Sequence, residues 1–226
     1  MQRTPLSKLL AVAAVLLLAV AAPAEPYWIT WEGDDYPENQ GWQRITYYGG
    51  SHRWLGLGNM VIDGLVTPTG SSDFYRLDAS MDIGPDQFFL MEWRLRVDQV
   101  PGLEDPGINM TSLDEAVVTY VYTCTSLYSL YEGVWLDFAP GVFHDYSLKS
   151  YDLVTYTLHI DGELAHTGQF APAGWDSGVQ WGDYGQSSRS LSTWDYVRFG
   201  IVPEPTGALL GLAALLVLLS SPGIRR

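Results

Sequence analysis

Alternation of apolar and polar side chains over residues 88–98 constrains the fold more than any other feature of the sequence. Side chains of an extended strand point alternately to opposite faces, so this segment would be apolar on one face and charged on the other. The apolar face would consist of Phe89, Met91, Trp93, Leu95 and Val97, and the charged face of Glu92, Arg94, Arg96 and Asp98. Such a strand fits an antiparallel sheet that covers a core with one face and meets water with the other.

Shorter β-rich segments occur along the whole chain. They combine β-branched or aromatic residues with flanking turn residues, and they cover 27–31, 44–48, 59–66, 73–78, 116–124, 134–138, 179–181 and 193–201. Between residues 25 and 201 we find no amphipathic helix of useful length. Many short strands with turn signals about 8–12 residues apart predict an all-β domain, a two-layer antiparallel β-sandwich or a barrel.

The clearest hairpin signal lies within residues 152–166. Two alternating runs flank the pair Asp161-Gly162. A type I′ turn needs positive φ at both central residues, and Asp-Gly is among the pairs that adopt this conformation most readily. The sequence therefore predicts two antiparallel strands that meet at Asp161 and Gly162.

Charge and cysteine content exclude several classes of protein. The formal net charge is −14, and such a field repels phosphate backbones and anionic lipid, so nucleic acid is not expected as a partner. Cys124 is the only cysteine, which rules out an intramolecular disulfide and a cysteine metal cluster. Because Cys124 ends a strand-like run, we expect a buried and inert thiol.

Residues 1–24 have the pattern of a secretory signal peptide. Arg3 and Lys8 form a positive beginning, and an apolar stretch of Ala, Val and Leu covers 9–20. Ala22 and Ala24 stand at the two positions that a signal peptidase reads, which places the cleavage after Ala24. The alternative is an uncleaved N-terminal anchor, although the apolar stretch is short for a membrane span.

The C-terminal residues 202–226 contain a second apolar segment. Residues 206–224 carry no charge, and as a helix they would extend about 28 Å, close to the hydrocarbon thickness of a bilayer. Arg225 and Arg226 would stop the span and mark its cytoplasmic side. Upstream, Pro203 and Pro205 break any helix and leave Glu204 in an extended, exposed peptide that a processing enzyme can grip.

This order of a Pro-Glu-Pro turn, one apolar helix and a basic end resembles the PEP-CTERM sorting signal of Gram-negative bacteria, whose members are substrates of exosortase. The resemblance implies export, transient anchoring in the inner membrane by the C-terminal helix, and a final location at the cell surface or in the extracellular matrix, alongside exopolysaccharide and biofilm. Two departures are the break at Pro222-Gly223 and the short basic end. The alternative is a simple C-terminal membrane anchor.

The body, residues 25–201, is predicted to be one domain, and from about Asp73 to Ile201 it resembles the concanavalin A-like, laminin-G-type jelly roll. The resemblance rests on the Phe-Phe-Leu-Met-Glu-Trp-Arg-Leu-Arg-Val strand, the Tyr-Thr-Leu-His-Ile-Asp-Gly-Glu-Leu hairpin and the final Trp-Asp-Tyr-Val-Arg-Phe strand. It implies that the first and last strands lie side by side, which would place 27–31 next to Ile201. Some members of this superfamily are glucanases that carry a Glu-x-Asp-x-Glu motif, and others bind calcium through loop carboxylates.

No catalytic constellation is evident. The Glu-x-Asp-x-Glu motif is absent, and the adjacent acidic pairs 34–35, 104–105 and 114–115 would point to opposite strand faces rather than toward each other. No Gly-x-Ser-x-Gly elbow is present. His159 and His166 lie on the two arms of the predicted hairpin and could approach each other, but two histidines without a third ligand do not make a metal site. We therefore expect no catalytic residue and no required cofactor.

Two binding hypotheses remain for the predicted loops. Calcium could use the carboxylates of Asp34, Asp35, Glu104, Asp105, Asp176 and Asp183, and the alternative is a solvated acidic surface. Glycan could stack on Trp175 and Trp181 beside Asp176 and Asp183, whereas Trp93, Trp135 and Trp194 are predicted to be core residues.

Taken together, the sequence favours an exported, non-catalytic surface protein. Its partners would be a signal peptidase, an exosortase-type enzyme, the membrane through the C-terminal helix and, for the β-domain, extracellular polysaccharide or protein. The alternatives are a glycoside hydrolase of the concanavalin A-like superfamily and a purely structural matrix protein.

Overall fold

The computed structural model describes residues 27–65, 72–79, 81–100, 106–112, 116–172, 177–183 and 190–204. The predicted signal peptide and residues 205–226, which include the predicted span, lie outside the described residues. In the part of the chain that is described, no helix has the length and apolar character needed to cross a bilayer.

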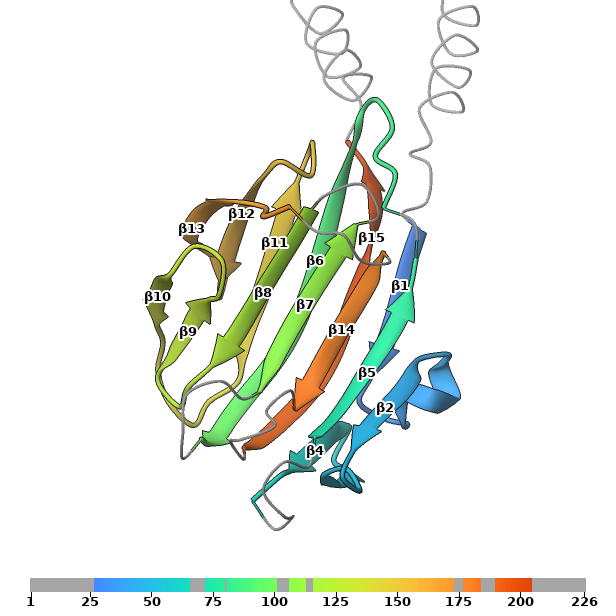
Figure 1. Ribbon diagram of the computed structural model, residues 1–226, viewed down its shortest axis with the longest axis vertical. Coiled ribbons are helices and arrows are strands. Elements are labelled where there is room, and N and C mark those ends of the chain that lie inside the picture. The colour runs from blue at the N-terminus through green and yellow to red at the C-terminus, as the bar shows by residue number, and fades with distance from the viewer. Residues whose placement is uncertain are drawn as a thin grey trace, which may run out of the picture.

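Two antiparallel sheets form the body (Figure 1). In the eight-stranded sheet the order is β13-β12-β11-β6-β15-β4-β3, with β1 also paired to β15. Its strands are β1 (Tyr27–Glu32), β3 (His52–Gly56), β4 (Asn59–Asp63), β6 (Gln87–Gln99), β11 (His144–Ser150), β12 (Thr155–Ile160), β13 (Glu163–Gln169) and β15 (Leu191–Pro203).

The seven-stranded sheet faces the viewer in Figure 1, and its order is β10-β9-β8-β7-β14-β5-β2. Its strands are β2 (Gln43–Tyr47), β5 (Ser72–Asp78), β7 (Gly107–Ser112), β8 (Ala116–Tyr122), β9 (Ser126–Ser129), β10 (Val134–Asp137) and β14 (Gly178–Asp183). One short 3₁₀-helix, η1 (Pro37–Gln40), follows β1. The two-layer sandwich predicted from the sequence is confirmed.

The three strongest sequence signals are confirmed by the register. The alternating segment is β6, and its apolar residues Phe89 to Val97 are buried between the sheets. The first and last strands pair as the jelly-roll resemblance implied, with Tyr27 opposite Ile201. Asp161 and Gly162 join β12 to β13 with φ values of 52° and 82°, the positive angles that a type I′ turn requires.

Aromatic side chains dominate the core between the sheets. Trp93 of β6 stacks on Tyr146 of β11 at a centroid distance of 5.3 Å and an interplanar angle of 7°, and its indole N–H donates to the Tyr122 hydroxyl of β8 at 2.6 Å. Trp194 is also fully buried, as predicted. Trp135 is not, because it lies on the edge strand β10 with its side chain directed away from the core and 47% exposed; its prediction as a core residue was wrong.

Two further expectations are corrected at strand ends. Cys124 lies two residues beyond the end of β8 and is only half-buried, and its Sγ accepts the backbone N–H of Val100 at 3.1 Å. At the C-terminal end, the peptide around Glu204 is extended but not free. Pro203 is the last residue of β15, and the N–H of Glu204 donates to the carbonyl of Asp86 at 2.7 Å.

Candidate functional site

The face of the seven-stranded sheet that points away from the core is the candidate site, and we call it the outer face. On β8 the core residues Val118, Tyr120 and Tyr122 point inward. The alternate residues of the strands therefore point outward. Outward residues include Trp135 and Asp137 on β10, Tyr128 on β9, Val117, Thr119 and Val121 on β8, Gly107, Asn109 and Thr111 on β7, Gly178, Gln180 and Gly182 on β14, Phe74, Arg76 and Asp78 on β5, and Gln43, Ile45 and Tyr47 on β2.

Aromatic pairs stand near both ends of the outer face. Tyr128 and Trp135 lie opposite each other in register, with ring centroids 4.5 Å apart and an interplanar angle of 29°. Four strands away, Phe74 stacks on Tyr47 at 6.0 Å, and Tyr47 is 46% exposed. Because neighbouring strands are about 4.8 Å apart, roughly 19 Å separate β9 from β5. We call the first pair the Tyr128–Trp135 platform.

Between the two aromatic pairs the outer face carries small residues. The register runs from Tyr128 through Val121, Gly107 and Gly182 to Phe74. Gly182 cannot be replaced without strain, because its φ is +130° and an added Cβ would lie 2.6 Å from the carbonyl oxygen of Asp73. The glycines keep side chains out of the path from one aromatic pair to the other.

A row of polar side chains runs parallel to this line of small residues. The register aligns Thr119, Asn109, Gln180, Arg76 and Gln43 across five strands. Asn109 Nδ2 donates to Thr119 Oγ1 at 2.7 Å, but Asn109 Oδ1 is buried and has no hydrogen-bond partner among the described residues. A buried acceptor without a donor costs about 1–3 kcal/mol. Asn109 is only 6% exposed and Thr119 8%, so this unpaired oxygen lies below the surface of the outer face and is not open to a ligand there.

Carboxylates on the outer face are too far apart to act together. Among the outward residues of the described strands, only Asp78 on β5 and Asp137 on β10 are acidic. Five strand spacings separate them, about 24 Å. Retaining glycosidases need two carboxylates about 5–5.5 Å apart and inverting enzymes about 6.5–9.5 Å. Asp78 also pairs with Arg76, which neutralises it locally.

The residues that the sequence suggested for glycan binding lie elsewhere. The sequence predicts Trp181 and Asp183 to be exposed loop residues, but both belong to β14, point inward and are fully buried. Trp181 packs against Trp31 and Trp194, with ring centroids 4.5 Å and 4.8 Å away. Ser51 donates to Asp183 at 2.6 Å. Trp175 and Asp176 lie outside the described residues.

The calcium and histidine hypotheses gain no geometric support. No group of three or more His, Cys, Asp or Glu side chains with metal-binding geometry occurs in the described parts of the chain, and Glu104, Asp105 and Asp176 are not described. His159 and His166 do not face each other in the register: His159 lies opposite Leu164, and His166 lies opposite Leu158. His166 Nε2 instead lies 3.0 Å from Glu132 Oε2.

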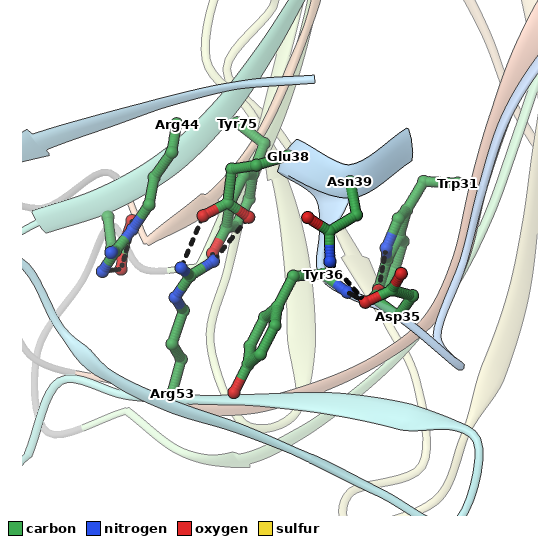
Figure 2. A network of polar contacts seen from close by, with 9 residues as sticks. Trp31, Asp35, Tyr36, Glu38, Asn39, Arg44, Arg53 and Tyr75 are labelled. Carbon is green, nitrogen blue, oxygen red and sulfur yellow. Dashed lines mark hydrogen bonds and ion pairs between the residues drawn. The ribbon is translucent and has the colours of Figure 1, made fainter. Parts of the chain in front are cut away.

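A second polar cluster closes one edge of the sandwich (Figure 2). Arg53 of β3 donates to both carboxylate oxygens of Glu38, at 2.7 Å and 2.5 Å, and to the Tyr75 hydroxyl of β5 at 2.7 Å. Its guanidinium also lies 4.4 Å from the centre of the Tyr36 ring. Because this cation is matched by a carboxylate, a hydroxyl and a ring, the cluster fastens η1 to both sheets and leaves little bonding capacity for a ligand.

The signals for the outer-face residues were weak in the sequence. Tyr128 belongs to a strand of only four residues. Asn109 belongs to β7, whose sequence Gly-Ile-Asn-Met-Thr-Ser contains no charged residue and only two large apolar residues. Trp135 alternates with Leu136 and could have been assigned to either face. Only the pairing of the strands reveals that these residues share one surface.

No protein-family model matches the chain, and no curated protein sequence matches it. Solved structures do. A carbohydrate esterase from the Shiga toxin-encoding bacteriophage phi24B superposes with a TM-score of 0.59 at 10% identity, over 78% of this chain and 98% of that one.

Two glucanases superpose comparably. A β-glucanase of Bacillus licheniformis gives a TM-score of 0.53 at 13% identity, over 78% of this chain and 99% of that one. A β-1,3-1,4-glucanase (lichenase) derived from a mouse hindgut metagenome also gives 0.53 at 13% identity, over 79% and 99%. At sequence identities this low, the structural similarity shows a shared fold and not a shared activity. The chain therefore shares with these proteins the concanavalin A-like jelly-roll fold.

Proposed function

We propose that this protein is an exported, non-catalytic polysaccharide-binding protein that uses the outer face of its seven-stranded sheet. The observation that carries the proposal is the Tyr128–Trp135 platform, whose Trp135 side chain is 47% exposed. Aromatic faces suit the C–H faces of sugar rings. The fold it shares with a carbohydrate esterase and two glucanases supports a saccharide as the ligand class.

The absence of a paired carboxylate on the described outer face supports binding over hydrolysis. Described outward residues are mostly neutral, with Arg76 beside Asp78. Such a surface would hold a polysaccharide through ring stacking and hydroxyl hydrogen bonds rather than through charge.

Export and sorting complete the proposal. A signal peptidase would remove residues 1–24, and an exosortase-type enzyme would process the chain near Pro203, Glu204 and Pro205 while residues 206–224 anchor it in the inner membrane. The β-domain would then reach the cell surface or the extracellular matrix. Mass spectrometry of the protein from its final location tests this part: a mature chain that retains Arg225 and Arg226 would contradict it.

Calorimetric titration of the full chain in mild detergent with mixed-linkage β-1,3-1,4-glucan and other neutral polysaccharides tests the binding part. Trp135→Ala is expected to weaken binding about tenfold, since stacked aromatic residues dominate such contacts. Tyr131→Ala is the matched control, because Tyr131 is exposed to a similar extent, 45%, in the turn of the same hairpin. Release of reducing ends from the polysaccharide would instead favour the glycoside hydrolase alternative.

A further inference from the structure

Glu132 lies in the turn between β9 and β10, and its carboxylate accepts hydrogen bonds from four donors. Ser129 Oγ donates to Oε2 at 3.2 Å, His166 Nε2 lies 3.0 Å from the same oxygen, and the Tyr156 hydroxyl also donates to it. The backbone N–H of Gln169 donates to Oε1 at 2.8 Å. Three of these donors belong to β12 and β13 of the eight-stranded sheet, so Glu132 joins the two sheets along one edge.

Apart from Glu132, the β9–β10 hairpin is held by the buried side chain of Leu127 and by the N–H of Leu130, which donates to the carbonyl of Thr119 at 3.0 Å. β10 is the edge strand of its sheet, and β9 pairs with β8 over only three residue pairs. A short two-stranded hairpin at a sheet edge is marginally stable without further contacts. The contact with the other sheet is close, because a Cβ on Gly168 of β13 would lie 2.5 Å from Glu132 Oε2. The Glu132 carboxylate therefore adds bonds to β12 and β13 of the other sheet, which the pairing of β9 with β8 does not provide.

The same hairpin carries the Tyr128–Trp135 platform, with Glu132 in the turn between the two strands that bear the rings. Any rotation of the hairpin against the rest of the sheet moves both rings together. We propose that Glu132 is a positioning residue that holds the Tyr128–Trp135 platform in the orientation for polysaccharide binding, and that protonation of Glu132 releases the platform. This inference rests on the proposed function.

The charge state of Glu132 is set by its donors. Burial by itself would raise the pKa of Glu132, but the hydrogen bonds from Tyr156, from the N–H of Gln169 and from His166 outweigh burial and lower this pKa below its usual value. Burial and the bond to Glu132 together raise the pKa of Tyr156, which stays a donor. A carboxylate with a lowered pKa keeps its bonds at neutral pH and loses them only in acid.

His166 does not supply the switch. It faces Glu132 through Nε2, and this nitrogen carries a proton both in the neutral tautomer that donates here and in the imidazolium. Tyr120 of β8, whose ring meets Tyr156 edge-on at 6.3 Å, has a raised pKa because it is buried, so it does not titrate in this range either.

Two measurements on the full chain in mild detergent test the inference. Hydrogen exchange reports the order of the β9–β10 hairpin relative to β6, and titration with mixed-linkage β-1,3-1,4-glucan reports binding. Glu132→Gln replaces one acceptor oxygen by an NH₂ group that cannot accept. We expect faster exchange in the hairpin alone and about tenfold weaker binding at neutral pH. Glu163→Gln on β13 is the matched control and is expected to change neither measurement.

The pH profile separates positioning from general stability. In the unsubstituted protein, the free energy of hairpin opening, obtained from exchange rates corrected for the intrinsic pH dependence of amide exchange, should fall together with affinity only below the ordinary glutamate range, about pH 4.3, and Glu132→Gln should lack this acid-dependent change in the hairpin. Tyr156→Phe, which removes one donor and keeps the ring, should give an intermediate effect. Unchanged binding together with faster hairpin exchange in Glu132→Gln would overturn the positioning role. If the unsubstituted protein binds no polysaccharide, the proposed function fails. The acid dependence of hairpin opening then still shows whether Glu132 holds the β9–β10 hairpin in place.

Discussion

The indole N–H of Trp93 and the hydroxyl of Tyr122 form a hydrogen bond of 2.6 Å across the core, so that a polar contact joins the two sheets between fully buried rings. Tyr122→Phe removes the acceptor and leaves the Trp93 N–H buried without a partner. We expect the free energy of unfolding to fall by about 1–3 kcal/mol. Chemical denaturation checks this value.

The double variant Trp93→Phe with Tyr122→Phe provides the contrast. It removes donor and acceptor together, so the cost of the unpaired N–H disappears, although the smaller ring at position 93 leaves a cavity. A double-mutant cycle isolates the hydrogen bond from the cavity. Strictly additive effects of the two substitutions would show that the bond contributes nothing.

Arg44 and Asp73 form the most buried ion pair of the described residues, and Asp73 is fully buried. Arg44 donates through Nε at 2.8 Å and through Nη2 at 2.5 Å. Burial raises the pKa of Asp73, and the bonds from Arg44 oppose this rise. Arg44→Met should therefore lower the free energy of unfolding by about 3–5 kcal/mol, since an uncompensated buried charge remains.

Pairing Arg44→Met with Asp73→Leu should restore much of this loss, because no buried charge is then left without a partner. Urea denaturation of the two single variants and the double variant gives the comparison. A double variant as unstable as Arg44→Met would mean that the packing of the arginine stem, and not the charge, is what stabilises this edge.

Asn109→Leu tests the unpaired amide on the outer face. The substitution removes the unsatisfied Oδ1 but also the donor to the buried Thr119 Oγ1, so the two effects oppose each other and the free energy of unfolding should change by less than about 1 kcal/mol. Affinity for polysaccharide should stay unchanged, because the amide is buried below the outer face. A clear fall in affinity, measured by calorimetric titration, would contradict this purely structural role of Asn109.

Asp161 should make the stability of the hairpin end depend on pH. Burial would raise the pKa of Asp161, but the N–H of Asp145 and the side chain of His144 donate to its carboxylate and lower this pKa. A lowered carboxyl pKa means stability that is present above the unfolded-state pKa and lost as the pH falls through the folded-state pKa.

Asp161→Asn should accordingly flatten the decline of unfolding free energy in acid and lower this free energy near neutral pH. Asparagine tolerates the positive φ of 52° at this position, so the turn itself is preserved. Denaturant midpoints measured from neutral to acidic pH give the two slopes. Parallel slopes for the two proteins would contradict the role of this carboxylate.

The sequence predicted the long strands and the hairpin because alternation over many residues leaves few other conformations. It missed β3, β7, β9 and β11, which are short or lack a clean period. Trp181 shows why the site was misplaced. Glycines on both sides of it suggested a loop, whereas Gly178 and Gly182 are needed because the backbone of β5 approaches them closely. Alternation predicts two faces of a strand, but only the partner strands decide which face meets the core.

The pairing of β15 determines how the domain bears mechanical load. β15 has β6 along one side and contacts β1 and β4 along the other, and its register with β6 continues as far as Pro203 opposite Gln87. A pull on the chain at Pro203 acts along the strand axis and loads these hydrogen bonds in shear, all at once, instead of opening them one after another. A domain attached through Pro203 would therefore resist mechanical unfolding more strongly than one pulled so that its hydrogen bonds open one at a time.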